Sequence, residues 1–250
     1  MKIRSITYFL DPGRPLQEAK LEHAGKFLQT ARSSFEQAGF EVQTARLATV
    51  PFGELIAEPD AQALSSLART LEDAGRLWGF DYVSLGPAAP DRPEDYALIP
   101  PVLAETENVF FSGHMTRPRG GISLPGVRDC ARVIRQAATI TPDGFANLRF
   151  AALANVAPGA PFFPAAYHAA GQPAFALAVE SADLAVRAFT GAGDVPEAQG
   201  RLRLAVEEHG RRLAAVAEEL SAGGREIFGG IDFSLAPFPE QPLSLGTAIE

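Results

Sequence analysis

Short apolar segments alternate with amphipathic segments along most of the chain. The apolar, β-rich segments predict strands over 3–10, 40–49, 80–88, 108–114 and 148–157. Between them, apolar residues recur every three or four positions, which predicts helices over 21–38, 59–79, 92–106 and 127–140. Strands that alternate with helices favour right-handed crossovers and a parallel sheet, and strands that are apolar throughout are typical of a sheet covered on both faces.

The pattern continues with a strand over 173–180, a helix over 181–191, a long helix over 195–221 and a strand over 227–239. We see no internal repeat, linker or low-complexity tract, so residues 1–250 are interpreted as a single α/β domain. The last residues look like the beginning of another helix. We therefore expect that an element is either supplied by a partner or absent from this chain.

Composition narrows the class of protein. Hydrophobic residues make up 46% of the chain and charged residues 21%, which is the mix of a globular protein with a real core. The net charge of −8 argues against a nucleic-acid partner. There is one cysteine, no signal-peptide pattern and no apolar run of about 18 residues, so we expect a cytoplasmic protein without a membrane partner.

The polar residues at the ends of the predicted strands are the candidates for a site. In parallel α/β folds, ligands gather where the carboxyl ends of the strands lead into loops. The residues at these ends are Asp11, Arg14, Ser112, His114, Asn155, His168, Glu180, Ser181, Asp232 and Ser234.

Ser112 and His114 lie two residues apart, so their side chains share one face of a strand. Ser112 can hydrogen-bond a ligand, and His114 can act as acid or base near neutral pH. The alternative is a strand end whose polar groups meet water or cap a helix. Arg117 and Arg119 flank a loop with two glycines, which suits an anionic ligand, but the pattern favours the alternative of a flexible turn.

The segment 160–168, "APFFPAAYH", delivers Tyr167 and His168 beyond the fifth predicted strand. His168 can be a general base or a metal ligand, with Tyr167 as a hydrogen-bond donor. The alternative is a tightly packed crossing in which alanines admit a neighbouring strand and His168 belongs to the core. Of the two helical histidines, we expect His209 to pack on an apolar stripe and His23 to lie on the surface.

Carboxylates end the two last predicted strands. Glu180 follows a fully apolar run, so it should either meet a cation or cap the following helix. Asp232 and Ser234 share a polar strand face, where Asp232 could orient a histidine or hold a metal, unless that face is simply solvated. Cys130 lies mid-helix beside apolar residues and is interpreted as core.

Several of these segments, taken in order, resemble the domain-of-unknown-function 711 family. They are "RSITYFL", "FSGHM", "APFFPAAYH", "FALAVES" and "GGIDFSLAPFP". The resemblance implies a barrel like that of pyruvate formate-lyase, in which two parallel half-sheets pack antiparallel and loops reach into the interior. Family members are longer at the C-terminus, which leaves closure of the barrel open in this chain. No glycyl radical is expected, because the one cysteine is helical and no glycine-loop motif of that enzyme class occurs.

We therefore expect an enzyme that acts on a small anionic molecule by acid–base or metal-assisted chemistry. The expected catalytic residues are His168, Tyr167, His114 and Asp232, and the expected ligand-binding residues are Arg14, Ser112, Arg117, Arg119, Asn155, Glu180 and Ser234. A divalent metal, if present, would take ligands from His168, Asp232 and Glu180. The alternative is a non-catalytic ligand-binding or regulatory module. We also expect a homo-oligomer, with the segment 237–250 as the first place to look for its interface.

Overall fold

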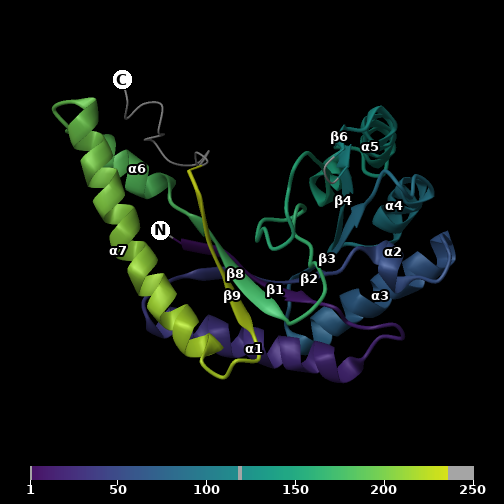
Figure 1. The fold of residues 1–250 in the computed structure, drawn as a ribbon, viewed down its shortest axis with the longest axis horizontal. Helices are drawn as coiled ribbons and strands as arrows, with labels where there is room; N and C mark the ends of the chain where they lie inside the picture. The colour runs from purple at the N-terminus through teal and green to yellow at the C-terminus, as the bar shows by residue number, and fades with distance from the viewer. Residues whose placement is uncertain (1, 118–119, 236–250) are drawn as a thin grey trace.

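The computed structural model describes residues 2–117 and 120–235, which form a seven-stranded sheet that curls into a half-barrel (Figure 1). Helices line the outer side of the curl, and the segment between β7 and β8 lies inside it (Figure 1). In the order in which they lie side by side, the strands are β7 (Phe150–Leu153), β4 (Val109–His114), β3 (Tyr82–Ala88), β2 (Val42–Thr49), β1 (Lys2–Leu10), β8 (Ala174–Glu180) and β9 (Ile227–Ser234). A separate pair consists of β5 (Thr116–Arg117) and β6 (Gly121–Ile122).

Helices connect most of these strands. They are α1 (Glu18–Gln37), α2 (Phe52–Leu55), α3 (Ala61–Trp78), α4 (Glu94–Glu105), α5 (Leu124–Ala137), α6 (Ala182–Phe189) and α7 (Val195–Ser221), with a 3₁₀ turn η1 (Phe145–Arg149) before β7. The predicted α/β fold with crossover helices is therefore confirmed.

The sheet contains two groups of parallel strands that meet antiparallel. Strands β1, β2, β3, β4 and β7 run in one direction, β8 pairs antiparallel with β1, and β9 runs parallel to β8. The expectation of one parallel sheet from the alternating pattern is wrong for β8 and β9. The reason is the connection 154–173 between β7 and β8, which contains no helix. It therefore does not form the right-handed crossover that joins parallel strands, and β8 runs in the opposite direction.

The outer helices bury the apolar stripes that the sequence predicts. In α1, the stripe from Leu21 to Phe35 is buried against the sheet. In α3, Asp60 accepts a hydrogen bond from the Ala63 N–H at the N-terminus, and Gly79 ends the helix with φ of 82°, a left-handed conformation that suits glycine. The buried stripe of α1 and the caps of α3 thus both follow from the local sequence.

Two element boundaries differ from the prediction. Helix α5 begins at Leu124, earlier than the predicted start at 127, because Ser123 caps it and Pro125 fits its first turn. The predicted strand 148–157 is shortened to β7 by the 3₁₀ turn η1 before it and an irregular segment after it. The β7 end therefore lies at Leu153.

The segment 160–168 crosses the inner, concave face of the sheet. The Thr7 hydroxyl donates to the Pro161 carbonyl at 2.7 Å, and the Ser84 hydroxyl donates to the Ala166 carbonyl at 2.7 Å. The His168 N–H donates to the Thr49 carbonyl at 2.9 Å. Ala166 packs in a small buried cluster with residues of three strands, Phe9, Ala48 and Ala176. The segment is thus the tightly packed crossing that the sequence left open as an alternative.

No helix in the described part of the chain is long and apolar enough to cross a membrane. The segment 237–250, in which we expect an interface, lies outside the described residues.

Candidate functional site

The structure divides the predicted site residues between the two edges of the sheet. Strands β1, β2, β3, β4 and β7 end at one edge, where His114 and the Tyr167–His168 pair lie. Strand β8 runs the other way, so Glu180 pairs with Lys2 at the beginning of β1, and Ser234 pairs with Glu180. The polar strand ends therefore do not converge, and Asp232, Glu180 and Ser234 lie at the edge opposite His114 and His168.

At the edge where β8 ends, Glu180 is buried and forms an ion pair with Arg4. It meets a cation, as one of the two expectations for it required, and Ser181 rather than Glu180 is the N-cap residue of α6. Asp232 is exposed, and the Ser234 carbonyl accepts hydrogen bonds from the N–H and hydroxyl of Ser181.

At the opposite edge, His114 and Tyr167 are in contact. Their rings meet edge to face with centroids 5.5 Å apart, and the Tyr167 hydroxyl donates to the Val156 carbonyl at 2.9 Å. Burial lowers the pKa of His114 and raises the pKa of Tyr167. Both groups are therefore kept neutral by their surroundings near neutral pH.

His168 and Ser112 are buried more deeply. His168 is 7% exposed, and its Nε2 finds no hydrogen-bond partner among the described residues; the same holds for the hydroxyl of fully buried Ser112. Burial lowers the pKa of His168, against the opposing effects of a hydrogen bond with the Gly171 backbone and the negative charge of Asp11. The imidazole of His168 is thus a neutral group near neutral pH, in the segment that crosses the inner face of the sheet.

The remaining expected ligand-binding residues that the structure describes are exposed, and the Asn155 N–H donates to the hydroxyl of Thr116, next to Arg117, at 3.3 Å. Arg14 is exposed and donates to the Ile56 carbonyl at 3.2 Å, and Arg117 is exposed in the short strand β5. Asn155 is exposed with φ of 57°, the left-handed conformation that asparagine tolerates. Arg119 lies outside the described residues.

A cavity of about 470 Å³ opens at the carboxyl end of β1. It lies between this strand end, the first turns of α1, the residues that precede β8 and the turn that precedes β9. Its lining residues are Tyr8, Leu10, Asp11, Ala19, Lys20, His23, Gly171, Pro173, Arg225 and Glu226. The volume is in the range of small-molecule sites. We call this space the β1-end cavity.

The Glu226 carboxylate organises the β1-end cavity. It is 7% exposed, and its Oε1 lies 2.6 Å from His23 Nε2 and 3.3 Å from the Tyr8 hydroxyl, which donates to it. Burial, followed by the charge of Glu226, raises the pKa of Tyr8, so the phenol stays protonated. Because an ionised carboxylate only accepts hydrogen bonds, the His23 ring donates from Nε2 when it is neutral. Its Nδ1 then carries the lone pair.

Cations accompany this histidine–glutamate pair. Lys20 lies one turn before His23 on α1 and donates to the Asp11 carbonyl at 3.0 Å, and Arg225 precedes Glu226. An ammonium and a guanidinium group in one cavity suit a carboxylate or phosphate group on a ligand.

His168 adjoins the β1-end cavity from the inner side of the sheet. The two groups that act on its imidazole, Asp11 and the backbone of Gly171, both line the cavity. His168 therefore lies next to residues that line the β1-end cavity but is not itself a lining residue.

Of the residues that line the β1-end cavity, sequence reasoning named Asp11 as a candidate and missed the others. His23, expected on the surface, is half-buried and bound to Glu226. One signal was available, since Lys20 and His23 are spaced by three residues on the helix that directly follows β1. Glu226 gave no signal, because its proximity to His23 depends on β9 joining the sheet beside β8.

The proposed metal ligands do not form a metal-binding cluster. Glu180 and Asp232 lie at one edge of the sheet and His168 at the other. Among residues 2–117 and 120–235, no group of three His, Cys, Asp or Glu side chains is placed to hold a metal ion. Cys130 is buried as expected; burial raises the pKa of its thiol to about 11.

The fold and cavity define an α/β half-barrel protein with a polar cavity at the carboxyl edge of its first strand. The chain belongs to the family described as uncharacterised ACR (DUF711), whose family model matches residues 1–250. The chain is 28% identical over 247 residues to a UPF0210 protein of Pelobacter propionicus, which covers 92% of this chain and 54% of the relative. It is also 28% identical over 254 residues to a UPF0210 protein of Desulforudis audaxviator. That match covers 91% of this chain and 53% of the relative. The chain thus spans about half the length of these curated relatives.

Proposed function

We propose that the protein is an enzyme that moves a proton on a small anionic molecule bound in the β1-end cavity, with His23 as the base. The observation that carries the proposal is the buried Glu226 carboxylate, which lies 2.6 Å from His23 Nε2 in a cavity that also holds Lys20 and Arg225. A histidine that is oriented by a carboxylate and half open to a cavity is a common arrangement for general acid–base catalysis.

Each group has a defined part in this reaction. Lys20 and Arg225 bind the anionic group of the substrate. His23 Nδ1 accepts the proton from the substrate, and Glu226 stabilises the resulting imidazolium through Nε2. Tyr8 donates to the same carboxylate and helps to hold it in place.

The roles expected for His168, Tyr167, His114 and Asp232 stay predictions. Within this proposal, His168 is a positioning residue, because its imidazole lies beside Asp11 and the Gly171 backbone, which both line the cavity. We also keep the pyruvate-formate-lyase-like barrel as a proposal for the fold of the family. The meeting of two parallel strand groups in antiparallel orientation at β1 and β8 supports it.

The proposal can be tested with small metabolites that carry a carboxylate or phosphate group. Purified protein is incubated in D₂O with a pool of such compounds, and mass spectrometry detects conversion or incorporation of deuterium. We expect at least one compound to change with wild-type protein and to remain unchanged with His23→Gln or Glu226→Gln. A matched control is His209→Gln, since His209 lies on α7 with its Nδ1 beside the Ala205 carbonyl and does not line the cavity.

Two outcomes would count against the proposal. Saturable binding of a compound without conversion by wild-type protein would favour a non-catalytic binding module. Conversion that persists in both cavity variants would move the chemistry to another site.

A further inference from the structure

A second cavity, of about 590 Å³, lies on the concave face of the sheet, away from the β1-end cavity. We call it the concave cavity. Tyr8 packs on the outer side of the sheet against Phe27 of α1, whereas Phe163, which crosses the inner face, packs against Arg46 near the middle of β2. The concave cavity is lined by Arg4, Arg46, Tyr82, Glu107, Asn108, Phe110, Thr141, Phe145, Ala146, Leu148, Arg149, Phe163 and Pro164.

Arg46 is the unusual group of the concave cavity. It lies in the interior of β2 and is 8% exposed, yet it forms no ion pair with any residue in the described ranges. Its Nε donates to the Thr44 hydroxyl at 2.8 Å, and its two terminal nitrogens have no acceptor among the described residues. Neither nitrogen is among the buried atoms without a partner, so both reach solvent in the cavity and are available to an acceptor on a ligand.

The neighbouring charged groups do not bind these nitrogens. Glu107 lines the cavity but is exposed, and among the described residues it makes no hydrogen bond with Arg46. The other two arginines can only donate: Arg4 pairs with Glu180, and Arg149 donates to the backbone carbonyls of Thr106 and Leu103 at 2.7 and 2.5 Å. The carboxylate that acts on Arg46 belongs to Asp81, which is exposed and already paired with Arg32 at 3.2 Å.

Aromatic rings fix the guanidinium group of Arg46 in place. Its Cζ lies 5.4 Å from the centroid of Tyr82 and 5.1 Å from that of Phe163. Phe110 packs edge to face against both rings. Such stacking leaves the edge of a guanidinium group, with its terminal nitrogens, free to bind in its own plane.

We propose that the concave cavity is a binding site for a small carboxylate that carries an aromatic or other apolar body. The planar fork of Arg46 matches the two oxygens of a carboxylate. The apolar body would contact Phe145 and Leu148 of η1, which are 65% and 59% exposed. Burial and the charge of Arg4 lower the pKa of Arg46 to about 10, so the group is still charged at neutral pH. The site is separate from the acid–base chemistry proposed at the β1-end cavity.

Benzoate is a suitable probe, and its binding to the full chain can be followed by calorimetry. We expect saturable binding to wild-type protein and a loss in affinity of roughly tenfold or more in Arg46→Met, because hydrogen bonds to a charged group are removed. Arg46→Lys, which keeps the charge without the fork, should bind with intermediate affinity. The matched control Arg211→Met changes an exposed arginine on α7 and should bind as wild type does. His23→Gln should also bind normally, which separates this site from the proposed function.

Several results would overturn the proposal. They are no saturable binding of benzoate, equal binding by Arg46→Met, equal binding of neutral benzyl alcohol, and stronger binding of inorganic phosphate than of benzoate. A wild-type dimer that dissociates in Arg46→Met on light scattering would mean that a second copy supplies the acceptor, which also overturns it. Circular dichroism shows whether Arg46→Met is folded. If it is not, the affinity of Arg46→Lys for benzoate and the comparison with benzyl alcohol test the proposal.

Discussion

Glu226 is the residue that links the polar groups of the β1-end cavity. Its carboxylate is buried but accepts from Tyr8 and His23, so its charge is compensated by hydrogen bonds within the cavity. Two side chains from different elements thus depend on one acceptor. The consequences of removing it are specific.

Glu226→Gln is expected to lower the pKa of the Tyr8 hydroxyl. The negative charge of Glu226 is one cause of its raised pKa; burial, the larger cause, remains, so the pKa should stay above the ordinary value of about 10. A ¹³C NMR titration of the tyrosine Cζ atoms measures this change. Tyr96, whose pKa burial also raises, is the internal control in the same spectra. Identical titration of Tyr8 in both proteins would show that Glu226 does not contact it in solution.

The lowered pKa values of His114 and His168 determine how the free energy of unfolding changes as the pH falls. The pKa values of His114 and His168 are lowered in the folded protein, so below about pH 6.5 the unfolded chain binds more protons than the folded one. The contribution of these two histidines to stability is therefore complete above about pH 6.5. It is lost as the pH falls towards their pKa values in the folded protein.

His168→Gln should make this loss smaller, because one of the two contributing groups is removed. Urea unfolding at pH 7.5 and 5.5 gives the difference for each protein. An equal loss in the variant and in the wild type would mean that His168 is not buried and neutral.

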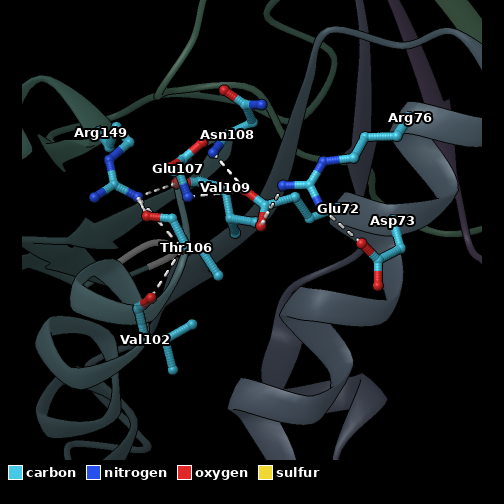
Figure 2. A network of polar contacts seen from close by, with 9 residues as sticks. All are labelled: Glu72, Asp73, Arg76, Val102, Thr106, Glu107, Asn108, Val109 and Arg149. Atoms are coloured by element: carbon cyan, nitrogen blue, oxygen red, sulfur yellow. Dashed lines mark hydrogen bonds and ion pairs between the residues drawn. The ribbon is translucent and has the colours of Figure 1, made fainter.

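At the scale of elements, close contacts between segments distant in sequence hold the half-barrel together. Figure 2 shows one such contact, in which Glu72 of α3 accepts from the N–H groups of Glu107 and Asn108 at 2.8 and 2.7 Å. From the other side, Arg149 of η1 donates to the carbonyl of Thr106 (Figure 2). The turn that leads into β4 is therefore held by its backbone.

Glu72→Ala is expected to destabilise the protein by about 2 kcal/mol or more, since it leaves two backbone donors without an acceptor. Glu72→Gln keeps an acceptor oxygen and should lose less. Urea unfolding of both variants, with the exposed Asp73→Ala as a control, measures the difference. Equal loss in the Ala and Gln variants would contradict the role of the acceptor.

Gly25 marks the contact between α1 and the end of α3. A Cβ atom there would lie 2.5 Å from the Trp78 carbonyl oxygen, so Gly25→Ala should destabilise by about 1–3 kcal/mol despite the helix propensity of alanine. Gly200 of α7 has open space at the same position, and Gly200→Ala should be neutral or stabilising by up to about 1 kcal/mol. Thermal unfolding of both variants checks the prediction, which fails if the two glycines respond alike.

The elements could be predicted from the sequence because each depends on its own periodicity and caps. The stripe of α1 is a local feature and is confirmed, and the caps of α3, Asp60 and Gly79, are equally local. The direction of β8 is not local: it depends on the path of 154–173 across the concave face, for which the apolar strand 174–180 gives no signal. Assigning Glu180 and Asp232 to the same edge as His114 followed from this one missed reversal.

At the scale of the whole molecule, the curl of the sheet produces two different polar spaces. The β1-end cavity lies between the end of β1, the first turns of α1 and the turn before β9, and the concave cavity is lined by Phe163 on the inner face. The segment 160–168 fills part of the inside of the curl (Figure 1), and the N–H of His168, at the end of this segment, donates to the Thr49 carbonyl. The chain spans about half the length of the curated relatives that it matches, and the expected homo-oligomer stays a prediction.

The central claim is that the acid–base centre is His23 with Glu226, and not the buried His168. The most direct test is the conversion of carboxylate and phosphate metabolites in D₂O by wild-type protein, His23→Gln and His168→Gln. We expect His23→Gln to abolish conversion and His168→Gln to retain a measurable part of it, since His168 acts only through the cavity wall. Full conversion by His23→Gln together with complete loss in His168→Gln would contradict the account.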